Sequence, residues 1–287
     1  METKGETASM IPEKQVICYK TIGETEITAD VYLPEGASKP MPLFFYIHSG
    51  GWIDGKADEL LVNFTDLTER LFADGVALVT IRYRFALNGL DYHAPITDSI
   101  DALRFFYDRA DEFGFDRDRI FIGGTSAGGH LTLTTAFAQS AFGSDPAYPT
   151  IRPCALIDMC GPVNFMQHGP VRSQKNSDAL LRNFLGGPDE ELAERAAEAS
   201  PITYIRKYPA DQLMPVIAVH GSLDELVNID QPLCLQATYA AANAPFELVT
   251  VENGKHSFKA VEGYPPPSLS YAEIQEKIYT FVKTYVY

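Results

Sequence analysis

The sequence predicts a mostly parallel β-sheet that is covered by helices on both faces. Short continuous apolar runs recur along the 287 residues, and such runs are typical of strands buried on both faces. Stretches with one apolar helical face alternate with them, which is the order expected of strands joined by covering helices. Because neither an internal repeat nor a long linker divides the chain, we expect one domain over residues 1–287.

A β-hairpin is expected at the start of the chain. Residues 15–21 and 26–33 are β-prone and flank the pair Gly23-Glu24. In the second run, apolar side chains alternate with polar ones, as in a half-buried strand. The remaining strands are predicted at six apolar runs: residues 43–47, 76–81, 120–123, 155–157, 216–219 and 248–251.

Helices are predicted between these strands and at the end of the chain. Residues 99–113 have one apolar face, and Gly114 closes that stretch. In the last stretch, Ser270 and Glu273 have the spacing of a capping box. Apolar residues then follow at spacings of four, three and four, as one face of a helix requires: Ile274, Ile278, Phe281 and Tyr285.

Residues 161–200 depart from this alternation. A Gly-Pro pair stands at each end of a polar stretch, and an alanine- and glutamate-rich run with helical character follows. We interpret the segment as a small insertion over the carboxyl ends of the strands, where function gathers in sheets of this type. A cap over a site and a plain connecting excursion are both open as interpretations.

The charge of the chain excludes one class of partner. Lys and Arg number 23 against 38 Asp and Glu, which gives a net charge of −15. Such a charge repels nucleic acids and anionic membrane surfaces unless a local basic patch exists, and the sequence has no evident patch of that kind. We therefore expect neither nucleic acid nor membrane as a partner, while a homodimer is left open.

The cysteines and the amino terminus bear on the compartment. The four cysteines show no C-x-x-C spacing, so we expect reduced, mostly buried thiols and no metal site. The first 14 residues are polar and lack the apolar core of a signal peptide, and no run reaches 18 apolar residues. The prediction is a cytoplasmic protein, or a secreted one if a leader has been removed.

The strongest chemical motif is Gly124-Thr125-Ser126-Ala127-Gly128, between a predicted strand and a predicted helix. G-x-S-x-G in this setting is typical of a nucleophile elbow, in which the serine takes a strained backbone conformation at a helix N-terminus. A dinucleotide-binding turn is the alternative. However, the glycines at 123, 124, 128 and 129 do not follow G-x-G-x-x-G, and residues 131–144 carry no acid. We therefore predict that Ser126 is a nucleophile.

A second glycine turn, His48-Ser49-Gly50-Gly51-Trp52, follows the strand predicted at residues 43–47. Such a turn can direct the amides of Gly50 and Gly51 at the oxyanion of a tetrahedral intermediate, joined by the amide of Ala127. Together with the elbow downstream, it favours an oxyanion hole over an ordinary glycine-rich loop. Trp52 either lines the substrate pocket or only packs.

A serine hydroxyl needs a base, and that base needs an orienting acid. Of the six histidines, His256 stands after the last predicted strand and before the last helix, where a loop can bring it to Ser126. The others fit other settings: His48 in the glycine turn, where its ring holds the loop, His130 in the helix after the elbow, His220 at a strand end, and His93 and His168 in loop-like segments.

The chain order serine, acid, histidine places the acid between residues 126 and 256. Asp224 is the first candidate, because it follows the strand predicted at residues 216–219 through a short turn. Asp158 ends the preceding apolar run and is the alternative. We expect Glu225 and Asp230 to be solvated loop charges.

The ordered motifs resemble the esterase and lipase branch of the α/β-hydrolases that includes hormone-sensitive-lipase-like and BD-FAE-type enzymes. They extend over nearly the whole chain: H-S-G-G-W at 48–52, Tyr83-Arg84, the elbow at 124–129, Ala199-Ser200-Pro201, H-G-S-L-D at 220–224 and K-H-S-F at 255–258. The resemblance implies an α/β-hydrolase fold, the triad Ser126, Asp224 and His256, and an oxyanion hole around Gly50, Gly51 and Ala127. Ser49 departs from the family, which usually has glycine there.

The function that these observations predict is that of a serine esterase working through an acyl-enzyme. The resemblance implies short acyl esters as substrates, often acetyl or aromatic acyl groups such as feruloyl on plant carbohydrate, without a cofactor. The partner would be a small-molecule or oligosaccharide ester. An arylformamidase, amidase or exopeptidase with the same triad is one alternative. A non-catalytic binding protein is the other, and it would be expected to lose the serine or the histidine that this chain retains.

Overall fold

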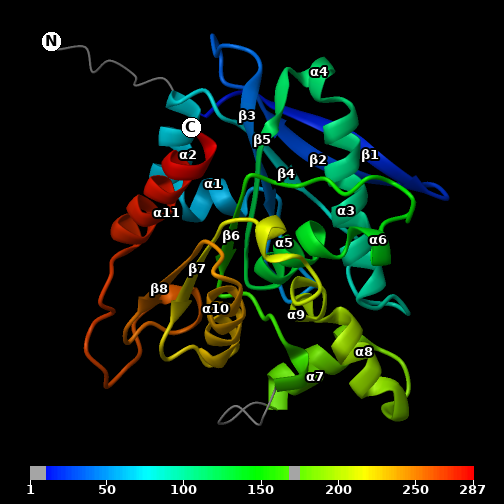
Figure 1. Cartoon of the computed structure of the whole chain (residues 1–287), viewed down its shortest axis with the longest axis vertical. Helices are drawn as coiled ribbons and strands as arrows, with labels where there is room; N and C mark the ends of the chain where they lie inside the picture. Colours follow the sequence, from blue (N-terminus) through cyan, green and yellow to red (C-terminus); the bar gives the residue numbers. More distant parts are fainter. Residues whose placement is uncertain (1–10, 168–174) are drawn as a thin grey trace, which may run out of the picture.

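The computed structural model describes residues 11–167 and 175–287, and the strands in these residues form one sheet in the order β1-β2-β4-β3-β5-β6-β7-β8 (Figure 1). β2 pairs antiparallel with β1 and β4, and all other neighbours are parallel. The predicted mostly parallel sheet is thus confirmed. The strands are β1 (Lys14–Ile22), β2 (Thr25–Tyr32), β3 (Met41–Ile47), β4 (Ala77–Ile81), β5 (Phe115–Thr125), β6 (Ala155–Met159), β7 (Val216–Gly221) and β8 (Phe246–Val251).

The strands follow the apolar runs because most of them are covered on both faces. Every residue of β3, β4, β6 and β7 is buried. The opening hairpin also forms where it was predicted, and its turn contains Gly23 with φ 60°. β5 is longer than its apolar run, because its first residue, Phe115, already pairs with Met41 of β3.

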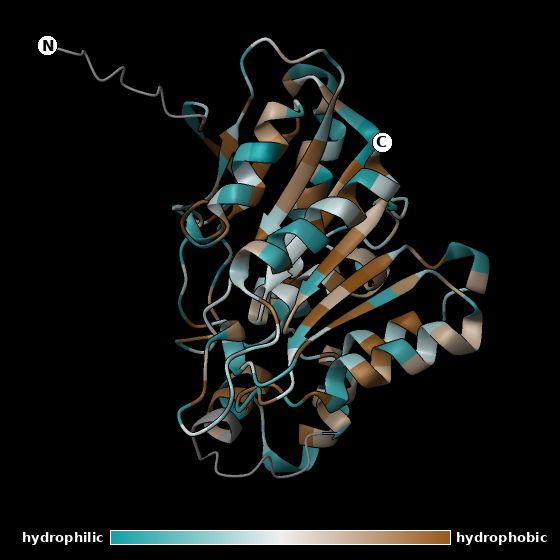
Figure 2. Ribbon diagram, turned by 90° about the vertical axis from the view of Figure 1, so that its left-hand side faces the viewer, coloured by the Kyte–Doolittle hydropathy of each residue, from teal (hydrophilic) through white to brown (hydrophobic). Residues whose placement is uncertain are grey.

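Helices cover both faces of the sheet, as predicted (Figures 1 and 2). Side chains alternate along β3: Phe45 belongs to one core layer, whereas Phe44 and Tyr46 belong to the other. The layer of Phe45 packs against α3, α5, α9 and α10, and the opposite layer packs against α1, α2 and α11. The helices are α1 (Glu59–Asn63), α2 (Thr65–Ala73), α3 (His93–Asp108), α4 (Ala110–Phe113), α5 (Ala127–Phe137), α6 (Gln139–Phe142), α7 (Lys175–Leu185), α8 (Leu192–Ala199), α9 (Pro201–Ile205), α10 (Asp230–Ala242) and α11 (Tyr271–Val286).

The helix expected over residues 99–113 differs from the prediction in two ways. It begins earlier, at His93, so this histidine is helical and not in a loop. Pro95 is compatible with that start, because the first turn of a helix does not use its N–H groups internally. The stretch is also divided at Arg109, with φ −97° and ψ 16°, into α3 and α4, and Gly114 in the left-handed region ends α4 as predicted. His168 lies outside the described residues.

The last helix has the predicted capping box but a slightly different apolar face. The Ser270 hydroxyl accepts the Glu273 amide, and the Glu273 carboxylate accepts the Ser270 amide. Tyr285, which the spacing placed in the core, is 37% exposed, while Val286 takes the buried position in the last turn. Val286 follows the buried Val282 by four residues and therefore lies on the same face.

The 161–200 segment contains α7 and α8, which lie together at one end of the molecule in Figure 1. Leu180 and Leu181 of α7 line the same pocket as Ser126, so this helix lies over the carboxyl ends of the strands. Residues 168–174 of the segment are outside the described part, and its interpretation as a cap stays a prediction. Among the described helices, none has both the length and the apolar character required to cross a bilayer.

Candidate active site

Three side chains from three loops lie in one chain of hydrogen bonds. The Oγ of Ser126 is 2.9 Å from Nε2 of His256, and Nδ1 of His256 is 2.7 Å from Oδ2 of Asp224. Because the carboxylate accepts the proton on Nδ1, Nε2 is free to accept the serine hydroxyl proton. The structure therefore brings together the three residues that the sequence singled out, in a geometry suited to nucleophile activation.

Ser126 occupies a sharp turn between β5 and α5, with φ 55° and ψ −116°. Its amide donates to the carbonyl of Met159 at 2.7 Å, which ties the elbow to β6. The flanking glycines are required by close contacts. A Cβ on Gly124 would lie 2.4 Å from the carbonyl of Gly128, and a Cβ on Gly128 would lie 2.0 Å from the carbonyl oxygen of Ile47. Side chains at these positions would push the elbow away from β3.

Asp224 is buried and surrounded by hydrogen-bond donors. Its Oδ1 accepts the amides of Leu226 and Val227, each at 2.8 Å, and its Oδ2 lies 3.3 Å from Nε2 of His220 in addition to the bond with His256. Burial raises the pKa of this carboxyl, but the nearby His220 ring and the hydrogen bond from His256 outweigh it and hold the pKa well below the usual range. Asp224 is therefore ionised at neutral pH. Nothing in the H-G-S-L-D pattern alone had indicated that His220 contacts the acid.

The other acidic candidates have different surroundings. Asp158 is buried and accepts the amide of Gly161 at 3.0 Å; burial raises its pKa to about 7. Glu225 is exposed, but its carboxylate accepts the backbone amide of His256 at 3.1 Å, so it is not merely a solvated charge. Asp230 is exposed as expected, yet it begins α10 and does not lie in a loop.

The loop that carries His256 is constrained on two sides. Ser257 has φ 61°, a left-handed value that is unusual for a non-glycine residue, and its carbonyl accepts the Tyr271 hydroxyl. The loop is also tied to the loop of the acid, because the amide of Leu223 donates to the carbonyl of Gly254 at 2.9 Å. Base and acid therefore have their relative positions set by backbone contacts as well as by their own hydrogen bond.

Cys160 is a neighbour of the base that the sequence did not reveal. It follows β6 with φ 48°, and its sulfur, a carboxylate oxygen of Asp224 and a ring nitrogen of His256 lie within 4.8 Å of one another. Burial lowers the pKa of His256, but Cys160 and Asp224 outweigh burial and raise it above the ordinary histidine value. This group is the one set of three potential metal ligands in the described part of the chain, and two of its members already bond to each other.

The cysteines correct one expectation. All four are free, but only Cys160 is buried. Cys18 is partly exposed on the edge strand β1, Cys154 precedes β6, and Cys234 lies on α10. The expectation of mostly buried thiols was therefore wrong, because three of these positions lie at the margins of the two core layers.

The glycine turn predicted as an oxyanion hole borders the same pocket as Ser126. Gly50 and Gly51 have φ values of 109° and 58°, and both line the pocket. Within the described residues, the amides of Gly50, Gly51 and Ala127 donate to no protein acceptor. They are thus available to an oxyanion placed beside Ser126.

The turn is supported from behind by two aromatic rings. The ring of His48 stacks on Tyr83 with 4.3 Å between centroids, and its Nδ1 donates to the carbonyl of Ser49 at 2.7 Å. This matches the prediction that the ring of His48 holds the loop. The Tyr83 hydroxyl adds hydrogen bonds to the carbonyls of His48 and Ser49, at 3.2 and 3.3 Å.

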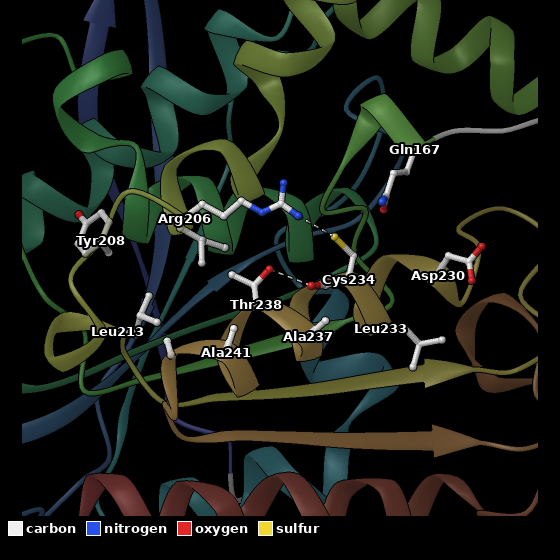
Figure 3. Close-up of a pocket in the computed structure, with 12 residues that line it drawn as sticks. Gln167, Arg206, Tyr208, Leu213, Asp230, Leu233, Cys234, Ala237, Thr238 and Ala241 are labelled. Atoms are coloured by element: carbon white, nitrogen blue, oxygen red, sulfur yellow. Dashed lines mark hydrogen bonds between the residues drawn. The ribbon is translucent and has the colours of Figure 1, made fainter.

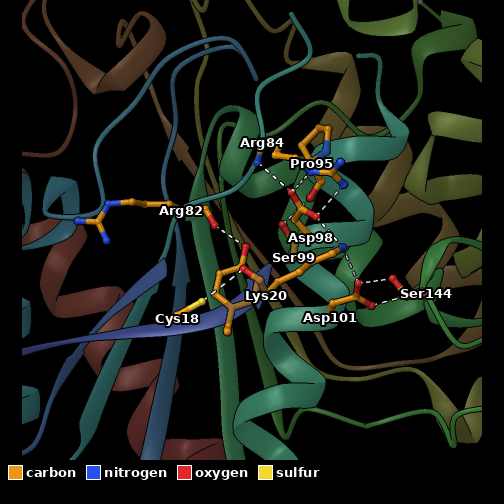
Figure 4. Close-up of polar contacts among 10 residues, drawn as sticks. Cys18, Lys20, Arg82, Arg84, Pro95, Asp98, Ser99, Asp101 and Ser144 are labelled. Atoms are coloured by element: carbon orange, nitrogen blue, oxygen red, sulfur yellow. Dashed lines mark hydrogen bonds and ion pairs between the residues drawn. The ribbon is translucent and has the colours of Figure 1, made fainter. Parts of the chain in front are cut away.

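The residue after Tyr83 anchors this support to the rest of the fold (Figure 4). Arg84 donates to the buried carboxylate of Asp98 through Nε and Nη2, at 2.8 and 2.9 Å, and Lys20 of β1 donates to the same carboxylate at 2.7 Å. Asp98 belongs to α3. The loop behind the oxyanion turn is therefore fixed to both α3 and β1, which gives the Tyr83-Arg84 pair a structural role.

The serine and the base open onto a largely apolar pocket of about 340 Å³. Trp52 lines it and is also packed, since it stacks on Phe184 at 4.0 Å and donates from Nε1 to Nδ1 of His130 at 3.2 Å. Leu180 of α7 lies against Gly51. The lining residues are Ser49, Gly50, Gly51, Trp52, Thr125, Ser126, Pro162, Leu180, Leu181, Leu226, Val227, His256 and Ser257.

A larger groove of about 930 Å³ runs along α10 (Figure 3). Arg206 and Cys234 line it together with small residues of α10, and none of the triad residues does. The smaller pocket is the better candidate for a reaction, because it combines an apolar wall with the nucleophile and base.

The elbow at the carboxyl edge of a mostly parallel sheet, with serine, histidine and aspartate joined there, defines the chain as an α/β-hydrolase. The chain belongs to the BD-FAE family, whose model matches residues 29–239.

Three similar proteins illustrate this relationship. An esterase from Fusarium pseudograminearum is 25% identical over 253 residues, covering 85% of this chain and 73% of the relative. Carboxylesterase NlhH from Mycobacterium tuberculosis is 32% identical over 177 residues, covering 58% of this chain and 52% of the relative. Esterase Est2 of Thermogutta terrifontis in its butyrate-bound structure has a TM-score of 0.73 at 22% identity, covering 96% of this chain and 95% of that one, and so shares the fold.

The chain does not span the full length of every relative. It covers about half of NlhH, and only 6% of a non-reducing polyketide synthase from Stereocaulon alpinum to which it is also similar.

Proposed function

We propose that this protein is a serine carboxylesterase that cleaves short acyl esters. The observation that carries the proposal is the hydrogen-bonded chain Ser126, His256 and Asp224, beside free amides in one pocket. Ser126 Oγ attacks the ester carbonyl carbon while His256 Nε2 takes the hydroxyl proton. His256 then gives that proton to the alcohol oxygen, the C–O bond breaks, and an acyl-enzyme remains. Water repeats the sequence and releases the acid.

The charges of the site suit this sequence of steps. Asp224 stays ionised and stabilises the imidazolium that forms when His256 takes the proton. The negative charge on the carbonyl oxygen develops at the helix N-terminus of α5, where the amide of Ala127 and those of Gly50 and Gly51 are free to donate.

The size of the pocket supports a short acyl group. About 340 Å³ is near the lower end of the roughly 300–1,000 Å³ typical of ligand pockets, and Leu180 and Leu181 border it. Est2 of Thermogutta terrifontis, which shares the fold, has been described with butyrate and with propionate bound. A carbohydrate esterase from gut microbiota also shares the fold, with a TM-score of 0.75 at 20% identity. Acetylated or feruloylated sugars therefore belong among the substrates to test.

The first experiment tests the nucleophile. Ser126→Ala should reduce turnover of p-nitrophenyl butyrate by about a millionfold, because triad members act as a unit. It should also abolish covalent labelling by a fluorophosphonate. Ser140→Ala, at an exposed serine of α6, should retain activity and labelling. A Ser126→Ala variant with a tenth of the original activity would refute the assignment.

A second experiment tests the substrate class. We expect the highest kcat/KM on acetate and butyrate in a nitrophenyl series that runs to octanoate and palmitate. Acetylated xylan oligomers and a feruloyl ester test for a sugar alcohol. A maximum at octanoate or beyond would contradict the short-acyl proposal, and a preference for N-formylkynurenine or a dipeptide amide would reassign the same triad to amide hydrolysis.

A further inference from the structure

Ser49, which stands where the family usually has glycine, makes two hydrogen bonds to one carboxylate. Its amide and its hydroxyl both donate to Oε2 of Glu59, at 2.9 and 2.5 Å. Glu59 is the first residue of α1 and is half-buried. The serine side chain therefore adds a second bond to one that its backbone already makes.

The other oxygen of Glu59 connects to the nucleophile elbow. Oε1 accepts the hydroxyl of Tyr46 at 2.9 Å, and that hydroxyl lies 3.0 Å from Oγ1 of Thr125. Burial raises the pKa of Tyr46 well above its usual value, so the phenol keeps its proton and donates. Since Thr125 directly precedes Ser126, one chain of hydrogen bonds runs from the oxyanion turn through Glu59 and Tyr46 to the elbow.

We propose that Glu59 is a positioning residue that sets the distance between the oxyanion amides and Ser126, with Ser49 as its contact on the turn. The proposal rests on the proposed function of Ser126 and of the glycine turn. The amides in question belong to two successive glycines with positive φ, which restrict their own backbone little. Fixing the peptide just before them is therefore an effective way to hold both amides in place for the transition state.

The chemistry of the contact favours a carboxylate. The carboxylate of Glu59 accepts hydrogen bonds from three donors, one N–H and two O–H groups. An ionised carboxylate suits this position because its oxygens only accept. Glutamine has the same shape but only one acceptor oxygen, so its NH₂ group would face Tyr46 or Ser49 and would reverse or remove one of these hydrogen bonds.

The central test is Glu59→Gln. Oxyanion contacts act mainly in the transition state, so kcat on p-nitrophenyl butyrate should fall while KM changes little. Losing a whole oxyanion donor costs about 10²–10³ in kcat, and a displaced but intact turn should cost less, roughly tenfold to a hundredfold. The inhibition constant of a trifluoromethyl ketone, whose serine adduct carries the oxyanion, should rise by a similar factor. A residue that only stabilised the fold would leave that constant unchanged in the active fraction, counted by fluorophosphonate titration.

Ser49→Ala gives an independent test, because it removes the hydroxyl bond and leaves the amide bond. We expect a loss in the same direction but smaller, and the double variant Ser49→Ala with Glu59→Gln should lose less than the product of the two single losses. Asp58→Asn, at an exposed acid next to Glu59, is the matched control and should keep full activity. Glu59→Asp should recover part of the activity if a carboxylate is what the turn requires.

Unchanged kcat and unchanged ketone affinity in both Glu59→Gln and Ser49→Ala would overturn the proposal. If Ser126→Ala is inactive while these variants behave like the wild type, only the role of Glu59 is refuted. If Ser126→Ala itself keeps its activity, the proposed function fails first. Should Glu59→Gln fail to fold, Ser49→Ala decides the question.

Discussion

The site has two halves that are built differently. On the side of β3 and β5, the groups that we propose to act besides Ser126 are backbone amides of the glycine turn, in which Ser49 contacts Glu59 and Tyr83. On the side of β7 and β8, they are the side chains of Asp224 and His256 on two loops. We call these the backbone half and the side-chain half of the site. A backbone donor can only be displaced by substitution, whereas a side-chain atom can be deleted. Substitutions should therefore have graded effects on the backbone half and abrupt effects on the side-chain half.

The most severe test of this contrast is a substitution of the acid, Asp224. Asp224→Asn should lower kcat by about ten-thousandfold, because an amide can no longer hold the histidine in the reactive tautomer or stabilise the imidazolium. Asp158→Asn is the matched control on the neighbouring strand, where the carboxylate accepts the amide of Gly161. It should cost far less. Steady-state kinetics on p-nitrophenyl butyrate measures both variants.

The reverse ranking would exchange the two acids. A near-normal Asp224→Asn together with a severe loss in Asp158→Asn would mean that the hydrogen bond between Asp224 and His256 is not the one used in catalysis. Comparable moderate losses in both variants would instead contradict the abrupt effect expected for the side chains on the side of β7 and β8.

The features that the sequence predicted well are those that depend on local patterns. The strands at residues 43–47 and 216–219 could be recognised because continuous apolar runs are buried on both faces. The elbow could be recognised because Gly124 and Gly128 are needed where the backbone passes within contact distance of β3. The placement of Ser126, Asp224 and His256 then followed from chain order and from the ends of strands.

The features that were missed depend on side-chain contacts between distant segments. Glu59 reaches Ser49 and Tyr46 only because α1 packs beside the end of β3, and an acid at a helix start is otherwise an ordinary surface residue. Cys160 reaches His256 across 96 positions because β6, β7 and β8 are neighbours in the sheet, so that the ends of β6 and β8 lie on either side of the end of β7. Neither contact leaves a periodic or spaced pattern in the sequence, so pattern analysis alone had no signal for them.

The second prediction concerns the pH dependence of the side-chain half. His256 must be neutral to accept the serine proton, so activity should rise with pH through the ionisation of His256. Although burial lowers the pKa of His256, Cys160 and Asp224 raise it overall, so the midpoint should lie above the ordinary value of about 6.5. Cys160→Ala removes one of the raising influences and should move the midpoint of the kcat/KM profile to lower pH, with little loss at the plateau.

Cys234→Ala provides the control for this measurement, since Cys234 lies in the groove along α10 and not beside the base. Its profile should overlay that of the wild type. A midpoint that does not move in Cys160→Ala, or that moves upward, would contradict the influence assigned to this thiol.

The smallest effect is expected where the 161–200 segment meets the backbone half. Leu180 lies against Gly51 and lines the pocket, so Leu180→Ala should enlarge the space available to the acyl chain without moving a hydrogen-bond donor. Each methylene that becomes buried contributes about 0.8 kcal/mol, so the ratio of kcat/KM for octanoate over butyrate should rise by roughly threefold to tenfold. Leu233→Ala makes the same change in the groove along α10 and should leave the ratio unaltered. If Leu233→Ala shifts the chain-length profile and Leu180→Ala does not, the acyl chain extends toward α10, and α7 does not limit its length.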